Sequence, residues 1–153
     1  MARVLVQEAA FDLAAETAAL SAGRTDVGGI ASFLGVCRAD DGLAAMVLDH
    51  YPGMTERAIA RIAAEAEARW PLTGCTIIHR MGRILPGEPI VLVLTASAHR
   101  AAALEACAFL IDWLKTSAPF WKREEFASGE QRWVEARAED DAAAARWAKA
   151  GGA

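Results

Sequence analysis

Cysteine is scarce in this chain, and two other features that would place it in a special class are missing. The three cysteines, Cys37, Cys75 and Cys107, are odd in number and form no Cys-x-x-Cys pair, so they indicate neither a disulfide framework nor a zinc site. No apolar run reaches the roughly 18 residues that a membrane helix needs, and the N-terminus lacks a signal-peptide pattern. We therefore expect a soluble protein of a reducing, cytoplasmic compartment, without a metal or other cofactor.

Positive charge is also in the minority. The chain has 16 basic and 20 acidic residues, for a net charge of −4, and an acidic chain is a poor general binder of nucleic acid. Any anion must therefore be bound by a local cluster of cations that opposes the net charge. Hydrophobic residues make up 54% of the 153 residues, which suits one folded domain over residues 1–153, with 150–153 frayed.

Strand and helix patterns are mixed along the chain, which predicts an α+β fold and not a doubly wound sheet. The continuous apolar run of residues 90–94 predicts a strand buried on both faces. Turn residues at 39–42 predict that the strands on either side form a hairpin, and Gly28 and Gly29 indicate a bulge or a close approach of the backbone to a ligand. Strands are expected at 3–8, 27–37, 43–50, 74–80 and 89–97, with two short strands within 123–136, and helices at 11–22, 55–69, 99–116 and 140–150.

The most informative segment runs from Leu114 to Glu125, where two lysines flank a proline at the end of an apolar helical run. Pro119 ends the helix because it lacks an amide hydrogen and clashes with the preceding turn. Lys115 could simply face the negative end of the helix dipole. When it is desolvated or crowded by a second cation such as Lys122, a lysine can also become a nucleophile.

Further cations could bind an anion together with these lysines. A helix N-terminus attracts anions through its free amide hydrogens, and His99 and Arg100 stand at such a position. His99 and Lys115 are nevertheless about 24 Å apart along one helix. They serve different sites, or a second subunit brings its own His99 to the Lys115 end, as a symmetric dimer would. The remaining candidates are Arg38 and Arg137.

Cys37 is the rival nucleophile, because the adjacent Arg38 could lower the pKa of its thiol. The alternative is a small buried apolar residue. His50 and His79 lie in strand patterns without metal-ligand spacing, and we interpret both as structural.

Six motifs, in this order, together resemble the large, catalytic subunit of molybdopterin synthase from about Val27 to Trp147. The lysine-bearing and His-Arg motifs are specific, and the others would be weak singly. The motifs are Phe33-Leu34-Gly35-Val36-Cys37-Arg38, His50-Tyr51-Pro52-Gly53-Met54, His79-Arg80-Met81-Gly82, Ser97-Ala98-His99-Arg100, the run from Leu114 to Glu124, and Arg132-Trp133-Val134-Glu135-Ala136-Arg137.

The resemblance implies a hammerhead-type α+β fold and an enzyme of molybdenum cofactor biosynthesis. The implied reaction transfers sulfur from the thiocarboxylated C-terminal Gly-Gly of a small ubiquitin-like subunit to cyclic pyranopterin monophosphate (precursor Z), which forms the dithiolene of molybdopterin. The implied assembly is a homodimer within a heterotetramer. By motif, Lys115 and Lys122 are the catalytic lysines, and the substrate-binding residues are Phe33, Arg38, His99, Arg100 and Arg137.

Departures from the family pattern are modest. Cys37 replaces a plain apolar residue, Asp49 replaces a frequent glutamate, and the acidic loop 39–42 could alter how substrate enters. The alternative interpretation is a non-catalytic dimeric module that docks a ubiquitin-like tail, in which Lys115 only neutralises a carboxylate. Such a module would not need Lys122 or Arg38.

Overall fold

The computed structural model of the protein describes residues 2–40, 42–134 and 138–151. Its elements alternate between strands and helices, as the mixed sequence pattern predicts. In chain order they are β1 (Arg3–Gln7), α1 (Leu13–Ser21), β2 (Gly29–Val36), β3 (Leu43–His50), α2 (Met54–Arg69), β4 (Leu72–Arg80), β5 (Gly82–Ile84), β6 (Pro89–Ser97), α3 (Arg100–Thr116), β7 (Phe120–Phe126), β8 (Gln131–Trp133) and α4 (Ala138–Gly151).

The described strands form two four-stranded sheets, so the α+β prediction is confirmed. The first sheet has the order β1-β4-β6-β2, with β1 parallel to β4 and the other pairs antiparallel. β6 lies inside this sheet and is buried along nearly its whole length. This agrees with its continuous apolar sequence, because a strand covered on both faces needs apolar side chains in both directions.

The second sheet has the order β5-β3-β7-β8, and it corrects one prediction. The segments 27–37 and 43–50 do not form a hairpin, because β2 pairs with β6 whereas β3 pairs with β5 and β7. Backbone hydrogen bonds between Cys37 and the turn at Gly87–Glu88 extend the β2–β6 pairing. The turn residues at 39–42 therefore carry the chain from one sheet to the other. The short strand β5 was not predicted.

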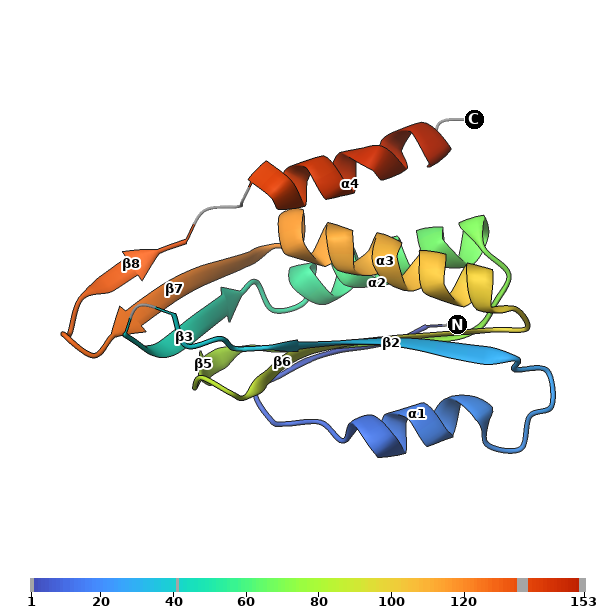
Figure 1. Ribbon diagram of the computed structural model, residues 1–153, viewed down its shortest axis with the longest axis horizontal. Coiled ribbons are helices and arrows are strands. Elements are labelled where there is room, and N and C mark those ends of the chain that lie inside the picture. The colour runs from blue at the N-terminus through green and yellow to red at the C-terminus, as the bar shows by residue number, and fades with distance from the viewer. Residues whose placement is uncertain (1, 41, 135–137, 152–153) are drawn as a thin grey trace.

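Helices cover both faces of the first sheet (Figure 1). α2 and α3 lie on one face, α1 lies on the other, and α4 lies on the outer side of α3. The larger core, which includes Ile59, Ile77 and Leu110, fills the space beneath α2 and α3, and a smaller cluster of Ile78, Leu92 and Leu94 faces α1. No helix of the described residues is long and apolar enough to span a membrane.

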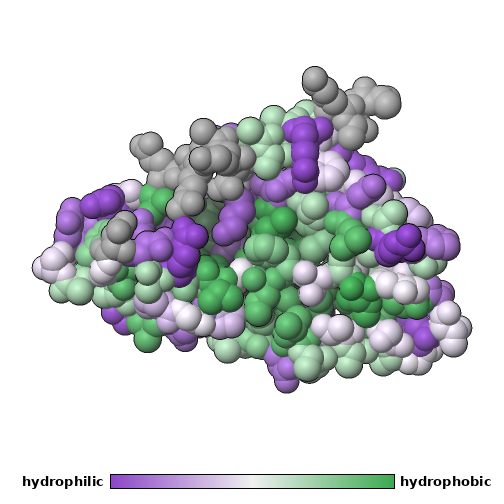
Figure 2. Space-filling view, viewed as in Figure 1, coloured by the Kyte–Doolittle hydropathy of each residue, from purple (hydrophilic) through white to green (hydrophobic). Residues whose placement is uncertain are grey.

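Several large apolar side chains of β2 and α3 are exposed at the edge of the first sheet. Within the described residues, nothing pairs with the outer edge of β2. Figure 2 shows apolar side chains gathered across the middle of the face that β2 and α3 form. The large exposed apolar side chains of these two elements are Phe33, Leu34 and Val36 of β2 and Leu104 of α3. We call these four residues the β2 face.

Candidate active site

The site begins at the break between α3 and β7, where the two predicted lysines lie. α3 ends at Thr116, and the Ser117 amide caps it by donating to the Trp113 carbonyl at 2.8 Å. The chain then turns through Pro119, and the Phe120 amide donates to the Ala118 carbonyl at 2.8 Å. Lys115 thus lies in the last helical turn, whereas Lys122 lies in the strand that leaves the turn. The predicted turn between the lysines is confirmed.

Phe120, the first residue of β7, lies against two histidine rings. Phe120 stacks on His79, with ring centroids 4.0 Å apart and an interplanar angle of 23°, and its centroid is 6.2 Å from that of His50. Burial, with smaller electrostatic contributions from Lys115 and His50, lowers the pKa of His79 to about 4, whereas a hydrogen bond to the Arg80 carbonyl opposes the shift. At neutral pH His79 is therefore an uncharged ring beside the exposed Lys115.

The Arg80 carbonyl also fixes the tautomer of His79. The Nδ1 atom lies 2.8 Å from this oxygen, and a carbonyl can only accept. Nδ1 therefore carries the proton, and Nε2 keeps its lone pair. The sequence interpretation of His79 as structural missed its place beside Lys115. The strand pattern of β4 contains no signal for this arrangement, since Lys115 comes from α3 and Phe120 from β7.

Lys122 reaches the end of β2. It is half-buried on β7 opposite Leu48 of β3, and its positive charge acts on the thiol of Cys37. Burial is the larger effect on that thiol and raises its pKa, with help from the negative charges of Glu88 and Glu124, while Lys122 opposes the rise. Cys37 is thus a buried, protonated thiol at neutral pH, which argues against its role as a nucleophile.

The other two cysteines are less reactive still. Burial raises the pKa of Cys75 to about 12 and that of Cys107 to about 11. All three thiols are buried. Within the described chain, no group of three or more His, Cys, Asp or Glu side chains is placed to hold a metal ion.

Two further candidates, Phe33 and Arg38, lie on β2 and directly after it. Arg38 directly follows β2 and is well exposed, and its Nε donates to a carboxylate oxygen of Asp40 at 2.7 Å. Phe33 lies in the middle of β2 with 37% of its surface exposed. Both side chains are therefore accessible to a ligand.

His99 and Arg100 lie at the opposite end of α3. His99 is the N-cap residue, its side chain makes no capping hydrogen bond within the described structure, and both side chains are exposed. Since α3 is one continuous helix, a single chain cannot bring these residues to Lys115, about 24 Å away. Arg137, the remaining candidate, lies outside the described residues.

The two glycines at the start of β2, Gly28 and Gly29, explain how the start of α3 is held. The Gly28 amide donates to the Ser97 carbonyl at 2.9 Å, and a Cβ on Gly28 would lie 1.9 Å from the Ala98 carbonyl oxygen. A Cβ on Gly29 would lie 3.7 Å from the Cα atom of Arg100, an ordinary contact. The close backbone approach predicted from these glycines is therefore to the protein's own chain.

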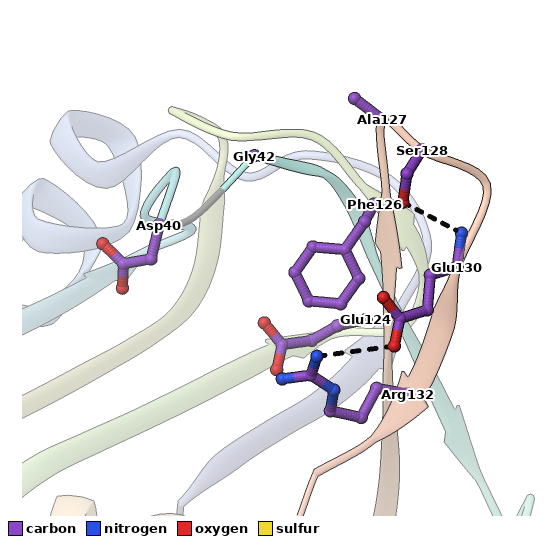
Figure 3. Close-up of a pocket in the computed structure, with 8 residues that line it drawn as sticks. All are labelled: Asp40, Gly42, Glu124, Phe126, Ala127, Ser128, Glu130 and Arg132. Atoms are coloured by element: carbon purple, nitrogen blue, oxygen red, sulfur yellow. Dashed lines mark hydrogen bonds and ion pairs between the residues drawn. The ribbon is translucent and has the colours of Figure 1, made fainter.

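A separate hollow of about 480 Å³ lies beside the β7–β8 hairpin (Figure 3). Asp40, Glu124 and Glu130 supply carboxylates to it, and Arg132 pairs with Glu130 at 3.5 Å and lies 5.0 Å from the ring centroid of Phe126. A hollow with three carboxylates and one arginine repels an anionic ligand. It contains none of the predicted site residues, although it includes Asp40, the ion-pair partner of Arg38.

Comparison with known proteins decides the family. Residues 6–117 match the family described as MoaE protein. The chain belongs to the MoaE family. The molybdopterin synthase catalytic subunit of Mesorhizobium japonicum is 59% identical over 146 residues, which cover 94% of this chain and 92% of that protein. The subunit of the same name from Pseudomonas aeruginosa is 54% identical over 147 residues, covering 94% and 97%.

Solved structures of MoaE proteins agree with this assignment. The molybdopterin biosynthesis MoaE protein from Burkholderia ambifaria has a TM-score of 0.83 and 52% identity, and the match covers 97% of this chain and 99% of that one. A complex of subunits 1 and 2 of molybdopterin-converting factor from Helicobacter pylori matches with a TM-score of 0.74 at 21% identity, covering 88% of this chain and 91% of that one. The second likeness supports the fold alone.

Proposed function

We propose that this chain is the catalytic subunit of a molybdopterin synthase, a sulfurtransferase of the cytoplasm. It transfers sulfur from the thiocarboxylated Gly-Gly tail of a small ubiquitin-like subunit to precursor Z and forms the molybdopterin dithiolene. The observation that carries the proposal is the identity of 51–59% to proteins named molybdopterin synthase catalytic subunit, over 94–96% of this chain.

Lys115 and Lys122 are the catalytic residues of this proposal. They flank one turn, and a lysine amine can act as a base or a transient acyl acceptor. The buried, protonated thiol of Cys37 is not a competing nucleophile. Arg38 suits the phosphate of the substrate, because a guanidinium binds phosphate through paired hydrogen bonds, and Phe33 lines the approach along β2.

The second half of the site comes from a second copy of the chain. β2 runs antiparallel to β6, and α3 follows β6, so that α3 and β2 run in the same general direction. If two β2 faces meet antiparallel about a two-fold axis, the N-terminus of each α3 lies near the C-terminus of the other. His99 and Arg100 of one subunit then bind the substrate at the lysines of its partner, and Arg137 is a further substrate-binding residue. With one small subunit at each end, the assembly is a heterotetramer.

Exposure supports the β2 face as this interface. Val36 is 48% exposed and Leu104 is 59% exposed. Because burial of apolar surface stabilises association, a partner that covers these side chains would be favoured. A contiguous apolar patch of this kind is typical of a contact between proteins.

Reconstitution tests the proposed function. The chain is mixed with a small subunit that carries a C-terminal thiocarboxylate and with precursor Z, and molybdopterin is measured. We expect product in this mixture and none when the small subunit ends in an ordinary carboxylate. Absence of product with a verified thiocarboxylate and a folded chain would overturn the proposal.

A further inference from the structure

The turn between the two lysines is attached to the rest of the fold by two side chains distant in sequence. One is Thr55, the second residue of α2, which is fully buried. The other is His79, the second-last residue of β4, whose side chain is buried with 7% exposed. Both residues belong to other elements, α2 and β4, so each acts on the turn through tertiary contacts.

Thr55 binds the turn through its hydroxyl group. Its Oγ1 donates to the Pro119 carbonyl at 3.0 Å and accepts from the Tyr51 amide at 3.1 Å. Both the donor and an acceptor position of the hydroxyl are therefore used, in a place without exposed surface. A buried carbonyl that loses its donor costs more than the hydrogen bond itself contributes. The bond thus opposes any movement of Pro119 away from the start of α2.

His79 holds the next residue of the same turn. Its ring stacks on Phe120, with centroids 4.0 Å apart, and its Nδ1–H donates to the Arg80 carbonyl at 2.8 Å, which fixes the plane of the ring. A neutral ring in a fixed plane gives Phe120 one preferred packing position. Phe120 is two residues before Lys122, and the same imidazole lies beside Lys115.

We propose that Thr55 and His79 are positioning residues, which hold the Pro119–Phe120 turn and thereby set the placement of Lys115 relative to Lys122. The proposal rests on the proposed function, because it assigns the two lysines to one reaction. Catalysis by positioned groups is sensitive to displacements of about 1 Å, which can cost on the order of a hundredfold in rate. Loss of one contact should therefore appear in kcat and not in folding alone.

The test compares two substitutions of Thr55. Thr55→Val keeps the shape of the side chain but removes the hydroxyl, whereas Thr55→Ser keeps the hydroxyl. In the reconstituted complex we expect Thr55→Val to lower kcat by about tenfold or more, with a smaller change in KM, and Thr55→Ser to stay near wild type. Leu20→Ala is the stability control, because Leu20 belongs to α1 and packs on the opposite face of the first sheet. It should lower the Tm without lowering kcat.

A second readout does not depend on the reaction. Hydrogen exchange of the Phe120 amide, which donates within the turn, should be faster in Thr55→Val than in Thr55→Ser or in Leu20→Ala. For His79, replacement by Phe keeps a ring against Phe120 and should retain most of kcat, whereas His79→Ala should lose it.

The outcomes separate the two proposals. A wild-type kcat in folded Thr55→Val, with unchanged exchange at Phe120, would overturn the positioning role. If the wild-type complex itself made no molybdopterin, the proposed function would fall, and the exchange of the Phe120 amide would still decide whether Thr55 holds the turn.

Discussion

The two ends of α3 differ in how the fold supports them. At the C-terminal end, Lys115 lies beside the buried ring of His79, and the turn that follows is held by Thr55. At the N-terminal end, His99 and Arg100 are exposed, and the His99 side chain makes no capping hydrogen bond within the described structure. The C-terminal end is thus packed against α2, β4 and β7, whereas the N-terminal end exposes its cations to solvent. This difference is what a site completed by a second chain requires.

Substitution of Lys115 should have the largest effect on the well-supported end. We expect Lys115→Ala to keep the fold but to lower sulfur transfer by at least about tenfold, equal to roughly 1.4 kcal/mol of barrier. Lys122→Ala should also be impaired. Initial rates in the reconstituted assay measure both, with Arg61→Ala, an exposed cation of α2, as the control. Retention of more than about a tenth of the activity by Lys115→Ala would contradict its role.

Acid should destabilise the same end through His79. The pKa of His79 is about 4 in the folded chain and near 6.5 when unfolded. Between these values the unfolded chain binds a proton that the folded chain does not. The free energy of unfolding should therefore fall as the pH falls from 6.5 to 4, by about 1.4 kcal/mol per pH unit, and this contribution is constant above pH 6.5.

Urea unfolding at several pH values measures this dependence, with His79→Phe as the reference because it cannot take up the proton. The pKa of His79 also reflects the charges of Lys115 and His50 and the Arg80 carbonyl, which remain in the variant. Equal pH dependence in the two proteins would show that His79 is not the group responsible.

At the exposed end, the two glycines at the start of β2 should differ in their tolerance of a methyl group. Gly28→Ala places a Cβ 1.9 Å from the Ala98 carbonyl oxygen, so that the start of α3 must move, at a cost of about 1–3 kcal/mol. Gly29→Ala meets Arg100 at an ordinary 3.7 Å and is the matched control. Denaturant unfolding compares the two, and equal stability would mean that the approach at Gly28 is not tight.

The smallest effect is expected at Cys37. Because burial keeps its thiol protonated, Cys37→Ser should change turnover by less than about twofold, or roughly 0.4 kcal/mol. The reconstituted assay with equal amounts of folded protein measures this. A Cys37→Ser protein without activity would revive the interpretation of Cys37 as the nucleophile.

Local features of the fold were readable from the sequence. Asp12 is of a residue type that favours helix N-caps, and it begins α1, since its side chain accepts from the Ala15 amide at 3.1 Å. The buried strand β6 followed from its apolar run. The prediction of a hairpin was wrong, because turn residues at 39–42 indicate where the chain reverses but not which strand pairs with β2. That choice depends on contacts between β2 and β6, about 60 residues apart.

The turn between the two lysines was predictable from the sequence, but the side chains that surround it were not. Lys115, Lys122 and the separation of His99 from Lys115 follow from the proline and from the length of one helix. Thr55 and His79 carry no such signal, because each meets the turn only after α2 and β4 have packed against it. A threonine near a helix start is also a common capping residue, which conceals a contact 64 residues away.

The central claim is that the lysine end of one α3 is completed by the cationic end of another. Complementation tests it most directly. Homodimers of Lys115→Ala and of Arg100→Ala should each be nearly inactive. Re-pairing the two proteins gives heterodimers in which one site carries both substitutions and the other carries neither.

We predict that such heterodimers recover about half of the activity of a wild-type dimer, because two-fold symmetry leaves one intact site in each. If Lys115 and Arg100 of the same chain served one site, both sites of the heterodimer would be damaged. A mixture that stays inactive after confirmed exchange of subunits, or a chain that remains monomeric at assay concentrations, would contradict the account.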